Sequence, residues 1–364
     1  MPASESVIEK EIQQCGLLDS AYYLSSYPDV HASGLDPVYH YCNFGWREGR
    51  KPNPYFDGAW YTQQNPDVLA ADMNPLLHYV RHGDHEGRRP VPVFDTAWYR
   101  VAYQIAPDGL ALAHFLTHRH GARALPSPEL FFVLHTNPYA ELAASGSDPF
   151  VAFAASTSTT SAISVEANII RRSGLFDSNY YLLNGSDLLE VDTDPAFHFC
   201  CWGWREHRKP NAYFDTAWYL RTNPEVSKLS INPLAHYIYE GEAVGRRPII
   251  YFDPTWYRET YAVPRCQSAL EHYLERRHLQ TVSPNPFFDP AWYVAQHANE
   301  VGAGRDAFAH YLYTGAFREI NPSERFDAVA YRRRHLGRPS RLFARLIDPH
   351  KDNPLVHYLR GSYR

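Results

Sequence analysis

A six-residue phrase, Phe-Asp-x-x-Trp-Tyr, recurs along the chain and constrains its fold more than any other feature of the sequence. Full copies begin at Phe56, Phe94, Phe214, Phe252 and Phe288, and weaker copies begin at Leu18, Phe176 and Phe326. A degenerate copy fills the stretch 129–154, which brings the series to about nine units of about 38 residues. Self-similarity at a fixed spacing of this length indicates a tandem repeat of small structural units.

Each unit carries start and stop signals for two short helices. In the second unit, Asp57 is a good N-cap for a helix that carries the Trp-Tyr pair. The step into Pro66 predicts the end of this helix, because proline disfavours helical geometry in the residue before it. Asn74-Pro75 then predicts a new helix start, and Gly83 predicts its end. The same signals recur in the other units, so the sequence predicts an all-α fold of helix-turn-helix repeats.

Helices of two or three turns are marginal alone in water, so every unit must bury its aromatic face. Aromatic residues make up 15% of the chain and fall mainly at the recurrent positions. We expect the Trp-Tyr pairs to interdigitate between successive units, together with the His-Tyr pair of the second helix. The tryptophans of these pairs include Trp60, Trp98, Trp218 and Trp256. The predicted architecture is a solenoid or superhelical array.

A longer period overlies the first. The capping residues Asp19, Asp57 and Asp95 reappear as Asp177, Asp215 and Asp253, each about 158 residues further on. We therefore expect a duplicated array, with a first repeat block over 1–155, an exposed Ser/Thr-rich linker over 156–163, and a second repeat block over 164–364. Each block is predicted to begin with a short leading helix that ends at a glycine.

The composition excludes several classes of protein. The formal net charge of -5 leaves no surplus of positive charge for phosphates, so nucleic acid is not an expected partner. Residues 1–14 lack the apolar core of a secretory signal, and no stretch is apolar enough to predict a membrane span. The five cysteines are an odd set without a Cys-x-x-Cys pair, which favours reduced thiols and a cytoplasmic location.

The first unit of each block has a bulky, charged loop after its second helix, and these two loops are the candidate ligand-binding sites. They combine an aromatic platform, guanidinium donors and a carboxylate, which together suit a sugar ring or a peptide carboxylate. The candidate residues are Trp46, Arg47, Glu48 and Arg50 in the first block, and Trp202, Trp204, Arg205, Glu206 and Arg208 in the second block.

A structural role for the same loops is the alternative. Other units place similar Gly-Arg-Arg-Pro sequences at the same point, and a feature present in most units is expected to hold units together. In that case the recurring arginines would bond to helix C-terminal carbonyls or to the capping aspartates. These arginines are Arg50, Arg88, Arg208 and Arg246.

A histidine recurs once per unit in the second helix. His78, His82 and His85 are the weak candidates for a metal site, but a His pair one helical turn apart without a further defined ligand is a poor signal, so we predict no metal. The recurring histidines are instead expected to be buried and bonded to backbone groups or tyrosine hydroxyls. No nucleophile with a base, paired-carboxylate site or phosphate-binding glycine loop stands out, so we predict no cofactor and no catalysis.

The combined pattern F-D-x-x-W-Y-L, N-P-D-V, N-P-L-x-H-Y and G-x-x-E-G-R-x-P resembles a tandem helical repeat of bacterial proteins. The resemblance covers most of the chain and is best from Asp19 to Asp95 and from Asp177 to Asp253. Such repeats are found beside glycosyltransferase domains in proteins of cell-surface polysaccharide assembly. The resemblance implies a non-catalytic binding or scaffolding module whose partner is a protein, such as a glycosyltransferase, or a saccharide chain.

Three functional interpretations stay open on the sequence. The chain is a scaffold for a protein partner, because solenoids expose long faces and this one is rich in Tyr and Arg. Alternatively, it is a lectin-like carbohydrate-binding module with two pseudo-equivalent sites at the tryptophan loops. The third interpretation is an accessory part of a larger glycosyltransferase polypeptide.

Overall fold

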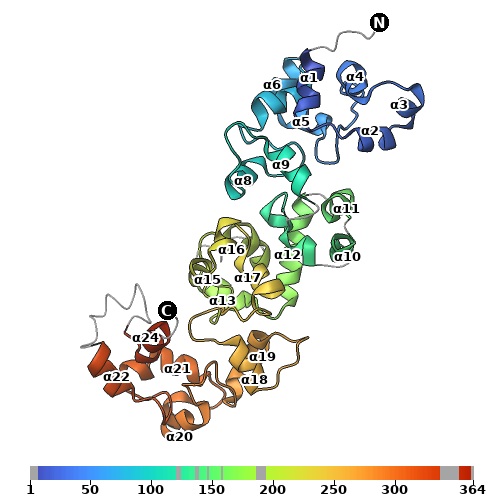
Figure 1. The fold of residues 1–364 in the computed structure, drawn as a ribbon. Coiled ribbons are helices and arrows are strands. Elements are labelled where there is room, and N and C mark those ends of the chain that lie inside the picture. The colour runs from blue at the N-terminus through green and yellow to red at the C-terminus, as the bar shows by residue number, and fades with distance from the viewer. Residues whose placement is uncertain are drawn as a thin grey trace. The chain divides into compact units, whose positions relative to one another are not determined.

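The structure, a computed structural model, describes residues 7–119, 124–135, 139–145, 147–156, 159–185, 194–336 and 352–361. Within these ranges every regular element is a helix, which confirms the predicted all-α class (Figure 1). None of the described helices has the length and apolar content needed to cross a membrane.

The chain divides into two compact units. The first takes in the chain up to Val165 together with Lys228–Ile231, and the second takes in Glu166–Ser227 and the chain from Asn232 onward. The helices up to the division are α1 (Val7–Gln14), α2 (Ser20–Ser26), α3 (Pro28–Ser33), α4 (Pro37–His40), η1 (Tyr41–Gly45), α5 (Gly58–Gln64), α6 (Pro66–Ala70), α7 (Pro75–His78), η2 (Tyr79–Gly83), α8 (Thr96–Ala102), α9 (Ala111–His118), η3 (Pro128–His135), α10 (Tyr139–Ala144), α11 (Pro149–Ser156) and α12 (Thr159–Arg172), which crosses it.

The helices that follow α12 are again mostly short. They are α13 (Ser178–Leu183), α14 (Pro195–His198), η5 (Phe199–Gly203), α15 (Thr216–Thr222), α16 (Pro224–Lys228), α17 (Pro233–His236), η6 (Tyr237–Gly241), α18 (Pro254–Thr260), α19 (Ala269–Arg276), η7 (Arg277–Leu279), α20 (Pro290–Val301), α21 (Ala307–Tyr313), η8 (Gly315–Phe317), α22 (Ala328–His335) and α24 (Pro354–Gly361).

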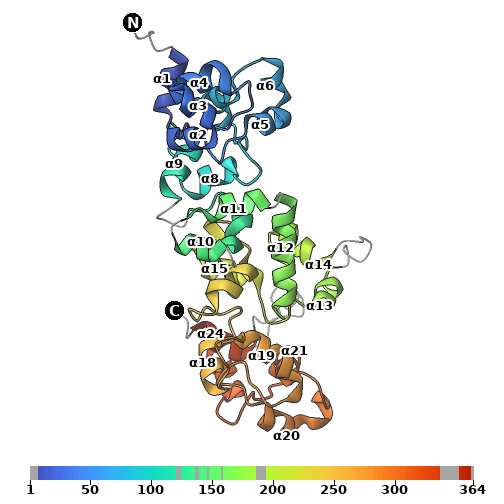
Figure 2. The same ribbon diagram turned by 90° about the vertical axis from the view of Figure 1, so that its right-hand side faces the viewer.

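The segment expected to be an exposed linker, 156–163, is mostly helical. The helix α11 ends at Ser156, and α12 begins at Thr159 and is the longest helix drawn in Figure 2. The linker was inferred from small polar residues, but Ser and Thr are only mildly unfavourable inside a helix. Buried Ala167 and Ile170 hold the later turns of α12, and the helix extends from them back through the polar residues.

The predicted helix starts are capped as expected, but the units that begin at Asp19, Asp57 and Asp215 each hold three short α-helices rather than two. The Asp57 carboxylate accepts a hydrogen bond of 3.0 Å from the Trp60 N–H, and the cap aspartate of each later Trp-Tyr helix does the same. The unpredicted helix is α6, which starts at Pro66. Proline ends α5 but its fixed φ also suits the first position of the next helix, so the Asn-Pro-Asp-Val segment forms a helix of its own.

Each unit closes on itself through its backbone. The N–H of the capping residue Asp57 donates to the carbonyl of Pro90 at the end of the same unit, at 3.2 Å. The equivalent pairs, at 2.9 to 3.2 Å, are Asp19 with Pro52, Asp95 with Pro126, Asp177 with Pro210, Asp215 with Pro248, Asp253 with Pro284 and Asp289 with Pro322. The same backbone hydrogen bond thus recurs at seven places in the described residues.

The recurring tyrosine of the Trp-Tyr pair makes its ring contacts mainly within its own unit, whereas we expected whole Trp-Tyr pairs to interdigitate between units. Tyr61 is fully buried, and its ring contacts those of Phe56 and Tyr79 with centroids 5.6 and 5.9 Å away. The neighbouring Trp60 is only half-buried. The tryptophans Trp98, Trp218, Trp256 and Trp292 are likewise half-buried. Adjacent side chains on a helix point about 100° apart, so one face cannot bury both members of the pair.

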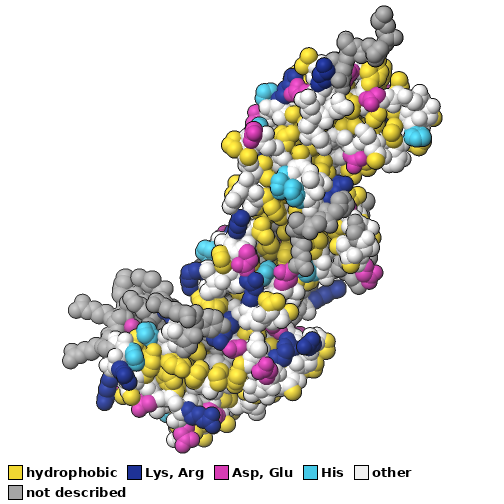
Figure 3. All heavy atoms as spheres, in the orientation of Figure 1, with side chains coloured by type: hydrophobic (Ala, Val, Ile, Leu, Met, Phe, Trp, Pro, Cys, Tyr) yellow, Lys and Arg dark blue, Asp and Glu magenta, His cyan; other side chains and the backbone are white. Residues whose placement is uncertain are grey.

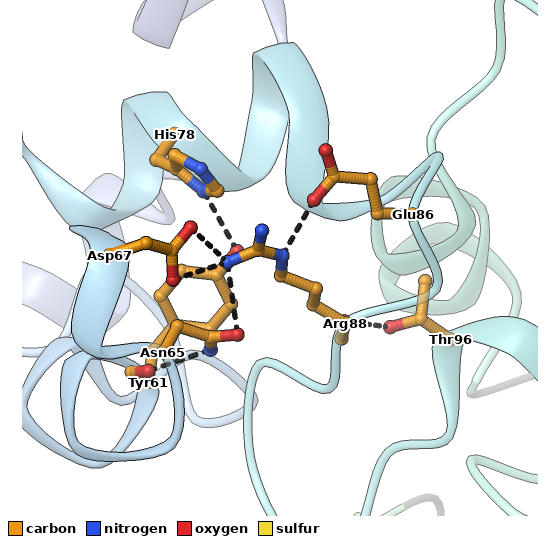
Figure 4. Close-up of polar contacts among 7 residues, drawn as sticks. All are labelled: Tyr61, Asn65, Asp67, His78, Glu86, Arg88 and Thr96. Atoms are coloured by element: carbon orange, nitrogen blue, oxygen red, sulfur yellow. Dashed lines mark hydrogen bonds and ion pairs between the residues drawn. The ribbon is translucent and has the colours of Figure 1, made fainter.

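A hydrogen bond between tyrosine and histidine joins the first and last helices of each unit. The Tyr61 hydroxyl and the His78 Nδ1 are 3.0 Å apart, as Figure 4 shows. The same bond, 2.8 to 3.0 Å long, joins Tyr23 to His40, Tyr99 to His114, Tyr181 to His198, Tyr219 to His236, Tyr257 to His272, Tyr293 to His310 and Tyr331 to His357. These bonds confirm the expectation that the recurring histidines bond to tyrosine hydroxyls.

A π-helical turn brings a glycine against this tyrosine. After α7 the helix continues as the π-helix η2, which ends at Gly83 with its Cα facing the Tyr61 hydroxyl. A side chain at Gly83 would collide with that hydroxyl. The same contact is made by Gly45 on Tyr23, Gly203 on Tyr181, Gly241 on Tyr219 and Gly315 on Tyr293. Glycine is therefore required here for close approach rather than for a turn.

A partly buried polar cluster of a tyrosine, an aspartate and an arginine occurs twice in the chain. The Tyr55 hydroxyl donates to the Asp148 carboxylate at 2.7 Å, and Arg119 lies 3.5 Å from that carboxylate and over the Tyr55 ring. The second copy consists of Tyr213, Asp306 and Arg277, with a Tyr–Asp distance of 2.6 Å and an Arg–Asp distance of 3.3 Å. Both clusters join residues 93 positions apart, so each closes one block of units.

We expect Gly83→Ala to destabilise the protein by about 1 to 3 kcal/mol, because the added methyl group overpacks the site against the Tyr61 hydroxyl. In a Tyr61→Phe background the same substitution should cost clearly less, since the colliding oxygen is gone. Chemical denaturation of the single and double variants measures this coupling. Gly361→Ala is the matched control, because no atom lies near its added methyl group. Strictly additive costs for the two substitutions would contradict the assignment.

Candidate functional site

The two tryptophan loops begin where the π-helices η1 and η5 end. Trp46 and Trp204 occupy the residue directly after each π-helix, and their indole N–H groups donate to the carbonyls of Cys42 and Cys200 at 3.2 and 3.1 Å. Trp204 is buried, with 6% of its surface exposed, and Trp46 is half-buried. Both indoles are therefore anchored to the preceding helical turn.

An arginine covers one face of each of these indoles. The Arg47 guanidinium lies 4.1 Å from the centre of the Trp46 ring, and Arg205 lies 4.4 Å from the centre of the Trp204 ring. Arg205 also donates to the Cys201 carbonyl at 2.7 Å. A cation over an aromatic face is a favourable contact of about 0.5 to 1 kcal/mol at exposed sites. The expected aromatic platform is consequently occupied in part by the loop itself.

The last arginine of the loop clamps the middle helix of its own unit. Arg50 makes a two-pronged contact with the Asp29 carboxylate at 2.9 and 2.7 Å, and its Nε donates to Glu48 at 2.5 Å. The hydrogen bonds from Arg50 lower the pKa of Asp29 to about 2. Arg208 makes the corresponding contact with Glu206 at 2.5 Å.

Figure 4 shows the same clamp in the second unit. Arg88 reaches the side chains of Asn65 and Asp67 at 2.8 to 3.1 Å and pairs with Glu86 at 2.6 Å. Its backbone carbonyl accepts from the Thr96 hydroxyl of the next unit at 2.8 Å. Arg246 repeats the clamp on α16 through Asn223 and Glu225. The arginine clamp therefore recurs in units that lack the tryptophan.

The structural alternative had assigned these arginines to helix carbonyls or capping aspartates, and this assignment is wrong. The capping aspartates are instead paired with the basic residue that follows the clamp, because that residue points towards the next unit. These pairs are Lys51 with Asp57 at 2.7 Å, Lys209 with Asp215 at 2.8 Å, Arg89 with Asp95, and Arg247 with Asp253.

The candidate residues thus divide into two groups. Trp46, Trp204, Arg50 and Arg208 face inward onto their own unit, whereas Arg47, Glu48, Arg205 and Glu206 are exposed. Trp202 is also exposed, with 52% of its surface accessible, and lies against the His198 ring with centroids 5.4 Å apart.

One exposed aromatic residue was missed by the sequence analysis. Phe44 is 46% exposed and corresponds to Trp202 when the two blocks are aligned. Its ring packs near Tyr39 and His40, with centroids 6.3 and 5.8 Å away. The sequence does contain a signal for Phe44. When Trp46 is aligned with Trp204, Phe44 falls at the position of Trp202. Each block therefore has one exposed aromatic ring two residues before an arginine-covered indole.

The weak metal candidates do not form a cluster. The His78 Nδ1 is engaged by Tyr61, and the His82 ring lies 5.5 Å from the His78 ring, centre to centre, while His82 and His85 are exposed. In the part of the chain that the structure describes, no group of three or more His, Cys, Asp or Glu side chains is placed to hold a metal ion.

Charged side chains of both signs are scattered over the face of the molecule that Figure 3 shows. In the clamps described above, an arginine faces one or two carboxylates. A search of protein families, of curated proteins and of solved structures finds no match to this chain. The geometry of the units themselves therefore carries the functional argument.

The tyrosine–histidine bonds should make stability fall as the pH drops below about 6.5. Burial lowers the pKa of His78, His114, His272, His310 and His357, so the unfolded chain takes up protons that the folded chain does not. The free energy of unfolding should be constant near pH 7.5 and decrease between pH 6.5 and 5. Urea denaturation across this range measures it. Asp29 titrates near 2, outside this window, and an unchanged stability down to pH 5 would contradict the assignment.

The two tryptophans of the second loop should differ in how much they contribute to the stability of the protein. Trp204→Ala removes a buried, hydrogen-bonded indole and should destabilise the protein by about 3 to 5 kcal/mol. Trp202→Ala removes a half-exposed ring and should change stability by less than about 1 kcal/mol. Thermal denaturation of both variants gives the comparison. Equal losses would mean that Trp202 is also part of the core.

Proposed function

We propose that this protein is a non-catalytic binding module whose units form a solenoid or superhelical array. The observation that supports this proposal is the repeated engagement of its reactive side chains in structure. The recurring tyrosine and histidine bond to each other, and the recurring arginines hold the aspartates of the same unit. Because these recurring side chains bond to each other, they are not available for catalysis. The residues left on the surface vary from unit to unit.

Contacts between neighbouring units support the array. The Tyr79 hydroxyl at the end of one unit and the Thr96 hydroxyl at the start of the next are 3.0 Å apart and buried. Across the same junction, Tyr55 packs edge-on to Phe115 with centroids 4.8 Å apart. Each unit thus depends on its neighbour for part of its core, which is the behaviour of quasi-one-dimensional repeat proteins.

The proposed partner is a glycosyltransferase of bacterial surface polysaccharide biosynthesis, and the proposed place is the cytoplasm. This part of the proposal depends on the resemblance of the repeat pattern to repeats found beside such enzymes. An array with exposed aromatic and arginine side chains suits a protein partner, because these residues are enriched in binding hot spots. An accessory part of a larger glycosyltransferase polypeptide would use the same surface.

A lectin-like role is the second candidate, and the paired loops favour it. Phe44 and Trp202 are exposed aromatic rings, each two residues before an indole that an arginine covers. An exposed ring beside a guanidinium suits the apolar face and the hydroxyls of a sugar. This candidate places one equivalent site in each block.

Binding to purified surface-polysaccharide glycosyltransferases and to a glycan array should distinguish the two roles. For a scaffold, we expect binding to a transferase, no signal on glycans, and at least about tenfold weaker binding in the Phe44→Ala, Trp202→Ala double variant. For a lectin, the same variant should lose glycan binding while its melting temperature is unchanged. The exposed Leu279→Ala variant is the control, because it removes exposed apolar surface outside both loops. Loss of neither activity would remove the loops from the proposal.

A further inference from the structure

A cleft of about 810 Å³ lies within the second compact unit, away from both tryptophan loops. It is bounded by the end of α12, the end of η6, the first turns of α18, and the loop that leads into α19, all labelled in Figure 1 except η6. Its lining includes Arg172, Arg265, Glu259, Glu271 and the exposed thiol of Cys266. None of these residues takes part in the tyrosine–histidine hydrogen bonds or the arginine clamps described above.

The floor of the cleft is a rigid ion pair. The Glu242 carboxylate accepts hydrogen bonds from Arg258 at 2.6 Å, from the Ser268 hydroxyl at 2.5 Å and from the Ala269 N–H at 2.6 Å. The same arginine donates to the carbonyls of Pro264 and Gln267 at 2.7 and 3.1 Å, which fixes the loop at the rim. The floor residues therefore satisfy each other and hold Arg265 and Cys266 in place.

The first block contains the same floor, which shows that the floor belongs to the architecture. Asp84 pairs with Arg100 and accepts from the Ala111 N–H at 2.9 Å. The arginine again donates to two carbonyls of its loop, those of Ala106 and Gly109, at 3.1 and 2.8 Å. The floor of the cleft and its rim can therefore be compared between the two blocks.

The ionisable rim is present only in the second block. The rim residues Arg172, Glu259, Arg265 and Glu271 replace Gln14, Val101, Pro107 and Ala113 of the first block. The same floor forms in the first block without any of these charges, so the fold does not require them. Four charged side chains around one cleft, without a structural need, indicate a ligand.

The rim has unused hydrogen-bonding groups of both kinds. Arg172 and Arg265 make no hydrogen bond or ion pair with any residue in the described ranges. Glu271 lies beside Gly174, where an added Cβ would lie 2.8 Å from its carboxylate oxygen, so the glycine leaves that carboxylate uncovered. Burial, together with the nearby Glu275, raises the pKa of Glu271.

We propose that this cleft binds an anionic sugar, that is, a hydroxyl-rich small molecule with one carboxylate. Its carboxylate would lie between the guanidinium groups of Arg172 and Arg265, which suit a planar anion. Its hydroxyls would donate to the carboxylates of Glu259 and Glu271. A neutral sugar leaves both guanidinium groups unmatched, and a basic one opposes them. This site is separate from the tryptophan loops and does not depend on the proposed scaffold or lectin role.

Calorimetric titration of the full chain with glucuronate, glucose and glucosamine tests the proposal. We expect glucuronate to bind at least about tenfold more tightly than glucose or glucosamine, with an affinity that falls as salt is added. Arg172→Ala and Arg265→Ala should each weaken glucuronate binding at least about tenfold. Arg318→Gln is the matched control, because it removes one exposed arginine of the same unit far from the lining and should leave binding unchanged.

Protection of Cys266 from a maleimide locates the bound ligand independently. Cys266 is exposed, whereas Cys200 is buried and burial raises the pKa of Cys15 and Cys42 to about 11 and about 12. Glucuronate should slow labelling of Cys266, and glucose should not. Equal binding of acidic and neutral sugars, no binding at millimolar glucuronate, or full affinity in both arginine variants would overturn the proposal. Tighter binding of polygalacturonate than of free galacturonate would support it with a polymer as the source.

Discussion

The hydrogen bond between a tyrosine hydroxyl and a histidine Nδ1 is the contact on which the rest of each unit depends. It buries a phenol that would otherwise lack a partner, and it fixes the distance between the first and last helices. In four units a π-turn then brings a glycine onto the hydroxyl, and in the unit of Tyr293 a 3-10 turn does so at Gly315. The arginine clamp and the backbone closure then act on a unit whose core is already defined.

The units that lack the glycine show that the bond and the π-turn are separable. In the third unit, Tyr99 bonds to His114 at 2.9 Å although α9 continues without a π-turn. Here His118 stacks on His114 with ring centroids 4.0 Å apart and fills the space near the histidine. The unit that ends in α19 follows the same plan. A histidine partner is thus common to all these units, while the way in which the second helix ends is variable.

Much of this fold follows from the sequence, and the failures have physical causes. Capping aspartates and Asn-Pro steps are local signals, so the helix starts were predictable. Which member of a Trp-Tyr pair is buried depends on how the helix is rotated, and which carboxylate Arg50 selects depends on residues 21 positions away. Neither is encoded locally. The π-turns were also missed, because the only signal for them is a glycine, which equally predicts a helix end. The composition of the two tryptophan loops identified them as candidate sites. Only the structure shows which of their aromatic side chains are anchored and which are exposed.

The partly buried clusters that join residues 93 positions apart have a consequence for how such a gene can change in length. If a whole block of about 158 residues is copied or lost, all three residues of its cluster are copied or lost together. The aspartate of each remaining cluster therefore keeps its tyrosine and arginine. Loss of the segment that contains Tyr55 or Tyr213 would instead leave the half-buried Asp148 or Asp306 without its phenol. A change in length by a whole block would therefore keep each cluster intact.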